Sequence, residues 1–185
     1  GTISACWCRA SISVIRDSSA AIHNSAGNLV GWVVVFHDIS QIEKMAQQLS
    51  WQASHDSLTG LVNRREFERR LAELVAAAKN DKRQHALLYL DLDNFKTVND
   101  RMGHNAGDQL LCDVAAAIKK VVTENDVSIR LGGDEFAVIT YIGSDTESDG
   151  AKVYLLASRL LDVLTFEMKD EVGTILVSAS IGVSL

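Results

Sequence analysis

Apolar and polar positions along most of the chain follow helical and strand periods in turn. Apolar residues recur at three- and four-residue steps in several stretches, which predicts amphipathic helices, and short apolar, β-branched runs between them predict strands. The predicted helices cover residues 40–54, 64–79, 94–101, 106–122 and 151–164, the predicted strands cover 85–91, 127–131, 135–141 and 175–185, and a polar loop is predicted at 143–150. This order predicts an α/β (α+β) fold with a central mixed β-sheet flanked by helices.

The first 39 residues alternate in the manner of strands. The turn sequence Ser25-Ala26-Gly27-Asn28 separates two alternating runs, and the second run extends from Leu29 to Phe36. This pattern predicts an N-terminal β-hairpin. Because an isolated hairpin is marginally stable in water, we expect this segment to need a partner surface.

The predicted helix at 40–54 carries an apolar seam. Ile42, Met45, Leu49 and Ala53 recur at the spacing of a and d positions in a coiled coil. Two interpretations remain open: the helix is a connector packed on its own domain, or it is a dimerising rod between two domains. The stretch is too short to identify a coiled coil from sequence alone, and we prefer the rod only because the segments on either side suggest it.

A second hairpin is predicted around Gly132 and Gly133. Adjacent glycines accept the positive φ angles of a two-residue turn, and two acids, Asp134 and Glu135, follow directly. A bend without side chains lets a large anionic ligand approach the backbone, and the acids can hold a cation beside that ligand. For an isolated turn of this kind, solvated surface acids are the simpler interpretation.

A second acidic cluster ends the predicted strand at 85–91. The run from His85 to Leu90 is nearly continuous in apolar residues, which predicts a strand buried on both faces. Asp91 at its end lies where α/β sheets usually bind ligands. If the hairpin lies beside this strand, Asp91 and Asp134 converge, and two carboxylates with backbone carbonyls suit Mg²⁺.

Asp93 and the residues after it belong to the start of the predicted short helix. We expect Asp93 to be the N-cap of this helix before it is a metal ligand. The amides of Asn94, Phe95 and Lys96 are then free donors at a helix start, which suits phosphate oxygens.

Composition narrows the classes of function. Hydrophobic residues make up 47% of the 185 residues and charged residues 23%, as in an ordinary soluble globular protein. The net charge of −6 argues against a nucleic acid polymer as a partner, and the lack of an apolar run of 18 or more residues argues against membrane contact within this stretch. An odd number of cysteines favours reduced thiols and a cytoplasmic location, with membrane anchoring elsewhere in a longer protein left open.

Several ordered motifs resemble those of the bacterial GGDEF-domain diguanylate cyclases. The signature is Gly132-Gly133-Asp134-Glu135-Phe136. The other motifs, in chain order, are Asp56-Ser57-Leu58-Thr59-Gly60-Leu61-Val62-Asn63-Arg64, Asp91-Leu92-Asp93-Asn94-Phe95-Lys96, Asn99-Asp100, Gly103-His104, Gly107-Asp108 and Ser180-Ile181-Gly182-Val183. The resemblance runs from Ser54 to Leu185 and implies a fold like that of nucleotidyl cyclases and polymerase palms.

The segment before this region resembles the end of a PAS sensor domain, whose usual Asp-Ile-Thr is here Asp38-Ile39-Ser40. The two resemblances imply three parts: residues 1–39 as the C-terminal fragment of a PAS-like domain, 40–54 as a linker helix, and 55–185 as a GGDEF domain truncated at its C-terminus. An unrelated hairpin is the alternative for the first part.

The resemblance to diguanylate cyclases implies a reaction and a site. Two GTP molecules condense into cyclic di-GMP and two pyrophosphates, with Mg²⁺ (or Mn²⁺) as cofactor, between the two subunits of a homodimer. The implied catalytic residues are Asp134 and Glu135, and the implied metal ligands are Asp91, Asp134 and the carbonyl of Leu92. The implied substrate-binding residues are Asn94, Phe95 and Lys96 for phosphates, Asn99 and Asp108 for guanine, and Gly132 and Gly133 beside the nucleotide.

Two departures from the family pattern limit what the resemblance implies. A product-binding feedback site, Arg-x-x-Asp, usually precedes the signature, and here the corresponding residues run from Thr123 to Asp126, so the aspartate is present without the arginine. Family members also continue beyond the position of Leu185 into a helix that supplies basic residues for the terminal phosphates. From this stretch alone we therefore expect weak GTP binding or no turnover.

Two alternatives to a cyclase remain. The domain is a non-catalytic GTP-binding regulator of an attached cyclic di-GMP phosphodiesterase domain of the EAL type, or it is a dimerisation module whose acids do no chemistry. The intact signature favours the cyclase over the first, and the ordered acids and guanine-type pair argue against the second.

Overall fold

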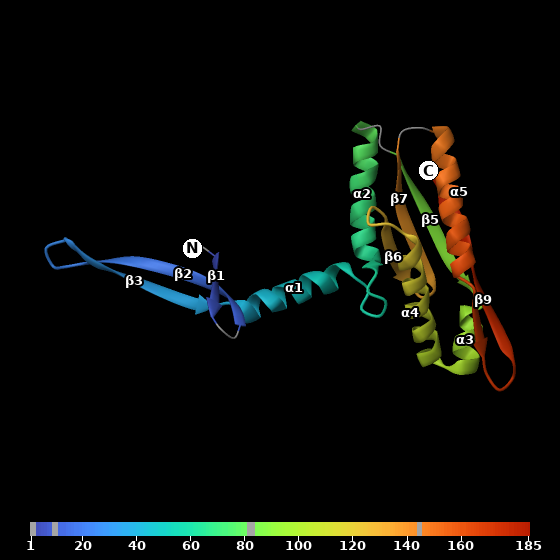
Figure 1. Cartoon of the computed structure of the whole chain (residues 1–185), viewed down its shortest axis with the longest axis horizontal. Helices are drawn as coiled ribbons and strands as arrows, with labels where there is room; N and C mark the ends of the chain where they lie inside the picture. Colours follow the sequence, from blue (N-terminus) through green and yellow to red (C-terminus); the bar gives the residue numbers. More distant parts are fainter. Residues whose placement is uncertain (1–2, 9–10, 81–83, 144–145) are drawn as a thin grey trace. The chain divides into compact units, whose positions relative to one another are not determined.

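The structure, a computed structural model, describes residues 3–8, 11–80, 84–143 and 146–185 (Figure 1). The chain divides into two compact units, Gly1–Trp51 and Gln52–Leu185. Each unit is described separately. Among the described helices, none is both long and apolar enough to cross a bilayer.

The first unit is built on a three-stranded antiparallel sheet in the order β1-β2-β3. Its strands are β1 (Ile3–Cys8), β2 (Ser11–His23) and β3 (Leu29–Asp38). The predicted hairpin is confirmed as β2 and β3, and its turn is closed by Asn24, whose Oδ1 accepts the amides of Ala26 and Asn28 at 3.0 and 2.9 Å. The third strand, β1, was not predicted, because no Gly, Pro, Asn or Asp separates Cys8 from Ser11 to indicate a turn.

Helix α1 (Ser40–Ser54) follows β3 directly and matches the predicted helix. The carboxylate of Asp38 accepts the amide of Ser40 at 2.9 Å, and the hydroxyl of Ser40 accepts the amide of Val14 at 2.8 Å. These contacts satisfy groups at the helix start and tie it to β2. The predicted seam residues Ile42, Met45 and Leu49 are exposed.

The second unit is a six-stranded mixed sheet with helices on both faces, as predicted (Figure 1). The strand order is β4-β6-β7-β5-β9-β8, in which β4 pairs parallel with β6 and all other pairs are antiparallel. The strands are β4 (Val62–Asn63), β5 (Gln84–Asp93), β6 (Val127–Gly132), β7 (Glu135–Gly143), β8 (Phe166–Lys169) and β9 (Thr174–Ser184). The helices are α2 (Arg64–Asn80), α3 (Phe95–Met102), α4 (His104–Val121) and α5 (Thr146–Val163).

Two apolar clusters hold the helices on the sheet. The larger cluster joins one face of β5, β7 and β9 to α3, α4 and α5. The smaller cluster joins the other face of β6 and β7 to α2, and Figure 1 shows α2 and α5 on opposite sides of the strands. Fully buried residues of the larger cluster include Leu88, Leu110, Phe136 and Leu160. On the face that carries α2, Tyr89 and Asp91 of β5 and their β9 partners Gly182 and Ser180 are exposed, so this end of the face is open.

Three sequence expectations need correction in the second unit. Strand β5 is not buried on both faces, because Ala86, Leu88, Leu90 and Leu92 are buried while Tyr89 and Asp91 between them are exposed. The short strands β4 and β8 were not predicted. Helix α5 begins inside the predicted loop 143–150, of which residues 144 and 145 lie outside the described residues. The polar residues before Gly150 resemble a loop, but they continue a helix that Val153 and Leu160 anchor in the core.

Candidate active site

The signature hairpin lies beside the end of β5. Strands β5 and β7 pair antiparallel with Asp91 opposite Glu135, and the amide of Leu92 donates to the carbonyl of Asp134 at 3.3 Å. Directly opposite residues point to the same face of a sheet, so Asp91 and Glu135 share the open face. The convergence expected for Asp91 and the signature acids is therefore confirmed.

The acids at this place repel one another. Asp91 is exposed, and Asp134 and Glu135 are half-buried. Desolvation by the surrounding chain raises the pKa of the Asp91 carboxyl above its ordinary value, and the charges of Asp134, Glu135 and Asp93 raise it further. A cation bound here would relieve this repulsion, because an opposite charge favours the ionised form of a carboxyl group.

Hard oxygen donors of the kind that Mg²⁺ prefers are present at this place. The expected ligands are the carboxylates of Asp91 and Asp134 and the carbonyl of Leu92, which are hard oxygen donors on adjoining backbone segments. Within the described residues, no group of three or more His, Cys, Asp or Glu side chains is placed to hold a metal ion. Two carboxylates and a carbonyl suit a metal that keeps phosphate and water in its other positions.

Asp93 does not cap helix α3, contrary to the sequence expectation. The N-cap residue is Asn94, whose backbone is left-handed with φ of 67° and whose side chain does not cap the helix. The carboxylate of Asp93 instead accepts the hydroxyls of Ser178 at 2.9 Å and Ser180 at 3.1 Å from β9. Asp93 is the last residue of β5 and pairs with Ser178, and the left-handed Asn94 separates it from the helix. Its carboxylate therefore lies beside β9 and not at the helix start.

The turn of the signature hairpin has the conformation that its two glycines predict. Gly132 has a φ angle of 146° and Gly133 a φ angle of 54°, and residues other than glycine rarely adopt these angles. Arg130 fixes the turn, because its Nε and Nη2 donate to the carbonyl of Gly133 at 3.2 and 2.9 Å and its Nη1 donates to Asp56 at 3.0 Å. The sequence reasoning did not assign a role to Arg130, although it stands two residues before the glycines.

The expected phosphate donors lie at the start of α3. The helix begins at Phe95, so the amides of Phe95 and Lys96 are in its first turn, where no intrahelical acceptor exists. Lys96 is exposed, whereas the ring of Phe95 packs against the larger apolar cluster. Asn94 donates its side-chain amide to the carbonyl of Leu176 at 3.0 Å, which ties the helix start to β9.

The two residues expected to contact guanine lie on adjacent helices, Asn99 on α3 and Asp108 on α4. Gly107 is buried beside Asn99, and a Cβ built on Gly107 would lie 2.0 Å from Asn99 Oδ1. The amide group of Asn99 therefore rests against the backbone just before Asp108, which is exposed. An amide and a carboxylate can together contact one guanine edge through its N–H groups and its carbonyl oxygen.

The residue expected to remain from the feedback site is engaged within its own turn. Asp126 Oδ2 accepts the amide of Thr123 at 2.7 Å and its hydroxyl at 2.9 Å. This carboxylate closes the turn between α4 and β6, a local role that the Thr-x-x-Asp spacing is able to indicate.

Two further groups on the open face were missed by the sequence reasoning. Tyr89 lies on the same face as Asp91, and the carboxylate of Glu135 on the neighbouring strand raises the pKa of its hydroxyl. Ser178 and Ser180 approach Asp93 from β9. Tyr89 and Asp91 alternate with leucines along β5, and this alternation was the available sequence signal. The expectation that both faces of the strand are buried led us to overlook it.

Comparison with known proteins identifies the family to which the second unit is similar. Residues 53–185 match the family described as diguanylate cyclase, GGDEF domain. The chain is 45% identical over 113 residues to the probable diguanylate cyclase DgcE of Escherichia coli, covering 61% of this chain and 10% of that protein. It is 41% identical over 126 residues to the cyclic di-GMP phosphodiesterase PdeB of Shewanella oneidensis, covering 68% of this chain and 14% of that protein.

The fold is similar to that of a solved member of this family. The coiled coil and GGDEF domain of DgcB from Caulobacter crescentus, solved in complex with c-di-GMP, matches with a TM-score of 0.68 at 26% identity, covering 78% of this chain and 75% of that chain. The chain spans only a small part of the two curated relatives above, 10% and 14% of their lengths. The family match covers more than half of the sequence, and the chain belongs to the diguanylate cyclase GGDEF-domain family.

Proposed function

We propose that this protein is a diguanylate cyclase, which condenses two GTP molecules into cyclic di-GMP and two pyrophosphates in a Mg²⁺-dependent reaction. The observation that carries the proposal is the pairing of Asp91 with the signature hairpin, which gathers Asp91, Asp134 and Glu135 at one end of β5. Intact acids at this place suit phosphoryl transfer, in which positioning and charge neutralisation supply most of the catalysis.

Each group has a defined task in this proposal. Asp91, Asp134 and the Leu92 carbonyl hold the metal, and bound Mg²⁺ (or Mn²⁺) would neutralise charge on the phosphates and lower the pKa of the attacking 3′-hydroxyl. Glu135 assists deprotonation of that hydroxyl. Gly132 and Gly133 leave the turn open to the nucleotide. The phosphate donors are the amides at Asn94, Phe95 and Lys96 with the Lys96 side chain, and the guanine contacts are Asn99 and Asp108.

One subunit supplies one GTP, so ring closure needs a homodimer. The apolar seam of α1, formed by Ile42, Met45 and Leu49, has the spacing that a dimerising rod needs. We also propose that residues 1–39 end a PAS-like sensor domain, residues 40–54 form the linker and residues 55–185 form the catalytic domain. The antiparallel three-stranded sheet and the helix that follows it directly support this division. The proposed location is cytoplasmic.

A second candidate function is regulatory GTP binding. The similarity to PdeB, a cyclic di-GMP phosphodiesterase, favours this candidate. In it, the domain binds GTP without turnover and controls an attached phosphodiesterase domain of the EAL type.

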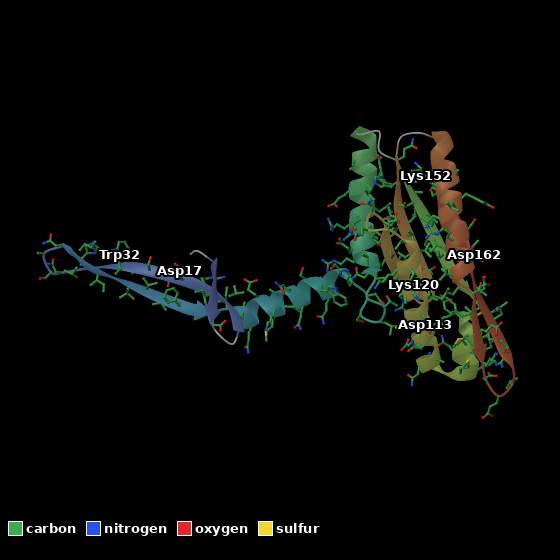
Figure 2. All side chains as sticks on the ribbon, viewed as in Figure 1. Asp17, Trp32, Asp113, Lys120, Lys152 and Asp162 are labelled. Atoms are coloured by element: carbon green, nitrogen blue, oxygen red, sulfur yellow. The ribbon has the colours of Figure 1, made fainter. Side chains whose placement is uncertain are left out.

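Incubation of the intact protein with GTP and Mg²⁺, followed by chromatography, tests the first candidate. Cyclic di-GMP is expected, and Asp134→Ala should lower its rate of formation by at least about a hundredfold, because one metal ligand is lost. Asp162→Ala, at an exposed position of α5 (Figure 2), is the matched control and should leave the rate unchanged. A wild-type rate for Asp134→Ala would remove the metal assignment.

The two candidates are separated by a binding measurement. If no product forms but a non-hydrolysable GTP analogue binds and Asp108→Ala abolishes that binding, the regulatory function is correct. If neither product nor binding is found, both candidates fail.

A further inference from the structure

Helix α3 carries proposed contacts to the phosphates and to guanine, but it is too short to hold its own position. It has eight residues, and isolated helices of this length are unstable in water. Val98 is fully buried, and Phe95 and Met102 pack against the larger apolar cluster. Apolar contacts are not directional, so the orientation of the exposed groups of α3 depends on polar contacts at the ends of the helix.

Both ends of α3 are held by the same element, the hairpin formed by β8 and β9 (Figure 1). At the start of the helix, the side-chain amide of Asn94 donates to the carbonyl of Leu176 on β9 at 3.0 Å. In its last turn, Arg101 makes a two-point contact with the carboxylate of Asp170, in which Nε donates to Oδ2 at 2.8 Å and Nη2 donates to Oδ1. One hairpin therefore tethers the helix at two places.

The Asp170 carboxylate is itself held by the turn between β8 and β9. Its Oδ1 accepts the amides of Val172 at 2.8 Å and Gly173 at 3.0 Å, and the amide of Asp170 donates to the carbonyl of Gly173 at 3.1 Å. The side chain of Asp170 is only 14% exposed and that of Arg101 30% exposed. Two-point contacts between arginine and a carboxylate are strong and specific in geometry, so this contact can fix the end of the helix.

We propose that the β8–β9 hairpin is a positioning element of the substrate site, and that Arg101 is the positioning residue that transmits its placement to α3. In this role Arg101 touches neither nucleotide nor metal. It sets where the amides of Phe95 and Lys96 and the side chain of Asn99 lie. The inference rests on the proposed function for the identity of the ligand, whereas the ordering of α3 in the free protein does not depend on a nucleotide.

Arg101→Ala in the intact protein tests the proposal. The dissociation constant of a non-hydrolysable GTP analogue should rise about fivefold while kcat stays within about twofold, because the displaced contacts serve the ground state and the transition state alike. Arg69→Ala is the matched control, since Arg69 makes the same kind of two-point contact with Glu66, at 2.8 and 2.7 Å, on α2. Its dissociation constant should equal that of the wild type. If Arg101→Ala also binds the analogue as the wild type does, the proposal is wrong.

A double-mutant cycle shows whether Arg101 acts through the hairpin. Asp170→Asn keeps an oxygen for the amides of the turn and replaces the acceptor of Arg101 Nε by an NH₂ group. It should weaken binding of the analogue as Arg101→Ala does, and the double variant should bind no more weakly than either single variant, because both changes remove one contact. Losses that multiply in the double variant would overturn the proposal. Circular dichroism melting checks that all variants fold.

Hydrogen exchange without nucleotide, followed by mass spectrometry, gives a readout that is independent of the proposed function. The amides of residues 98–102 should exchange about tenfold faster in Arg101→Ala than in the wild type, because the helix is released at its end, and Arg69→Ala should show no change there. Unchanged exchange in Arg101→Ala would contradict the proposal. If α3 exchanges faster in Arg101→Ala but the wild type binds no GTP analogue, the hairpin still orders α3 and only the proposed function fails.

Discussion

Strands β3 and β5 have the same length and similar apolar content, but they lie in different environments. Each has ten residues. In β5, Ala86, Leu88 and Leu90 are fully buried under helices, whereas in β3 Trp32 remains 63% exposed (Figure 2) and Phe36 65% exposed. An alternating apolar pattern therefore predicts that a strand forms, but burial depends on whether another element covers it.

The largest expected difference between the two units is in the free energy of unfolding. Phe136→Ala, at a fully buried position of β7, should lower it by about 3–5 kcal/mol, because a cavity is left in the core. Trp32→Ala in β3 should lower it by less than about 1 kcal/mol, because most of the ring is already in water. Urea unfolding followed by circular dichroism at 222 nm measures both. Equal effects would mean that β3 is covered in solution.

Two glycine-to-alanine substitutions compare a position beside Asn99, a proposed guanine contact, with a position in the first unit. Gly107→Ala places a Cβ 2.0 Å from Asn99 Oδ1, so Asn99 must move. We expect KM for GTP to rise about tenfold and the free energy of unfolding to fall by about 1–3 kcal/mol. Gly31→Ala in β3 is the control, since no atom lies within 4 Å of its added Cβ. Steady-state kinetics and urea unfolding decide, and an unchanged KM for Gly107→Ala would remove Asn99 from the guanine contacts.

The smallest expected effect is a loss of stability of the second unit at acid pH. Burial alone would raise the pKa of the Asp56 carboxyl, but hydrogen bonds from Thr59 and the contact with Arg130 outweigh burial and lower it. The stability from this contact is therefore present above the unfolded pKa of about 3.8 and is lost as pH falls through the lower folded value.

Unfolding of the wild type and of Asp56→Asn, compared between pH 6 and pH 3, checks this dependence. The wild type should lose more stability than the variant over that range. Asp162→Asn on α5 should follow the wild type. If Asp56→Asn shows the full acid response of the wild type, the Asp56–Arg130 contact does not contribute to it.

Much of the second unit was predictable from local pattern. The bounds of α2 and the signature hairpin agree with the sequence expectation within about two residues, because apolar periodicity and paired glycines are local signals. The meeting of Asp91 with the hairpin was expected only on the condition that the hairpin lies beside β5, and the structure supplies that pairing. The roles of the individual site residues remain predictions.

Other features could not be predicted because they depend on contacts between distant segments. Asp93 was misassigned as a cap because its partners, Ser178 and Ser180, lie on β9. The Arg130–Asp56 contact joins residues 74 positions apart. Strand β8 is short, and its pairing partner is a later segment, β9. Spacing along the chain gives no measure of such pairings.

The division of β5 into a core side and a reactive side has a consequence for how this protein can change over evolutionary time. Insertion or deletion of a single residue within β5 before Asp91 would reverse the side of the following strand residues, so that carboxylates would enter the interior and a leucine would face the open side. Lineages that retain activity should therefore vary this strand by substitution alone, while length changes accumulate in the connections around it.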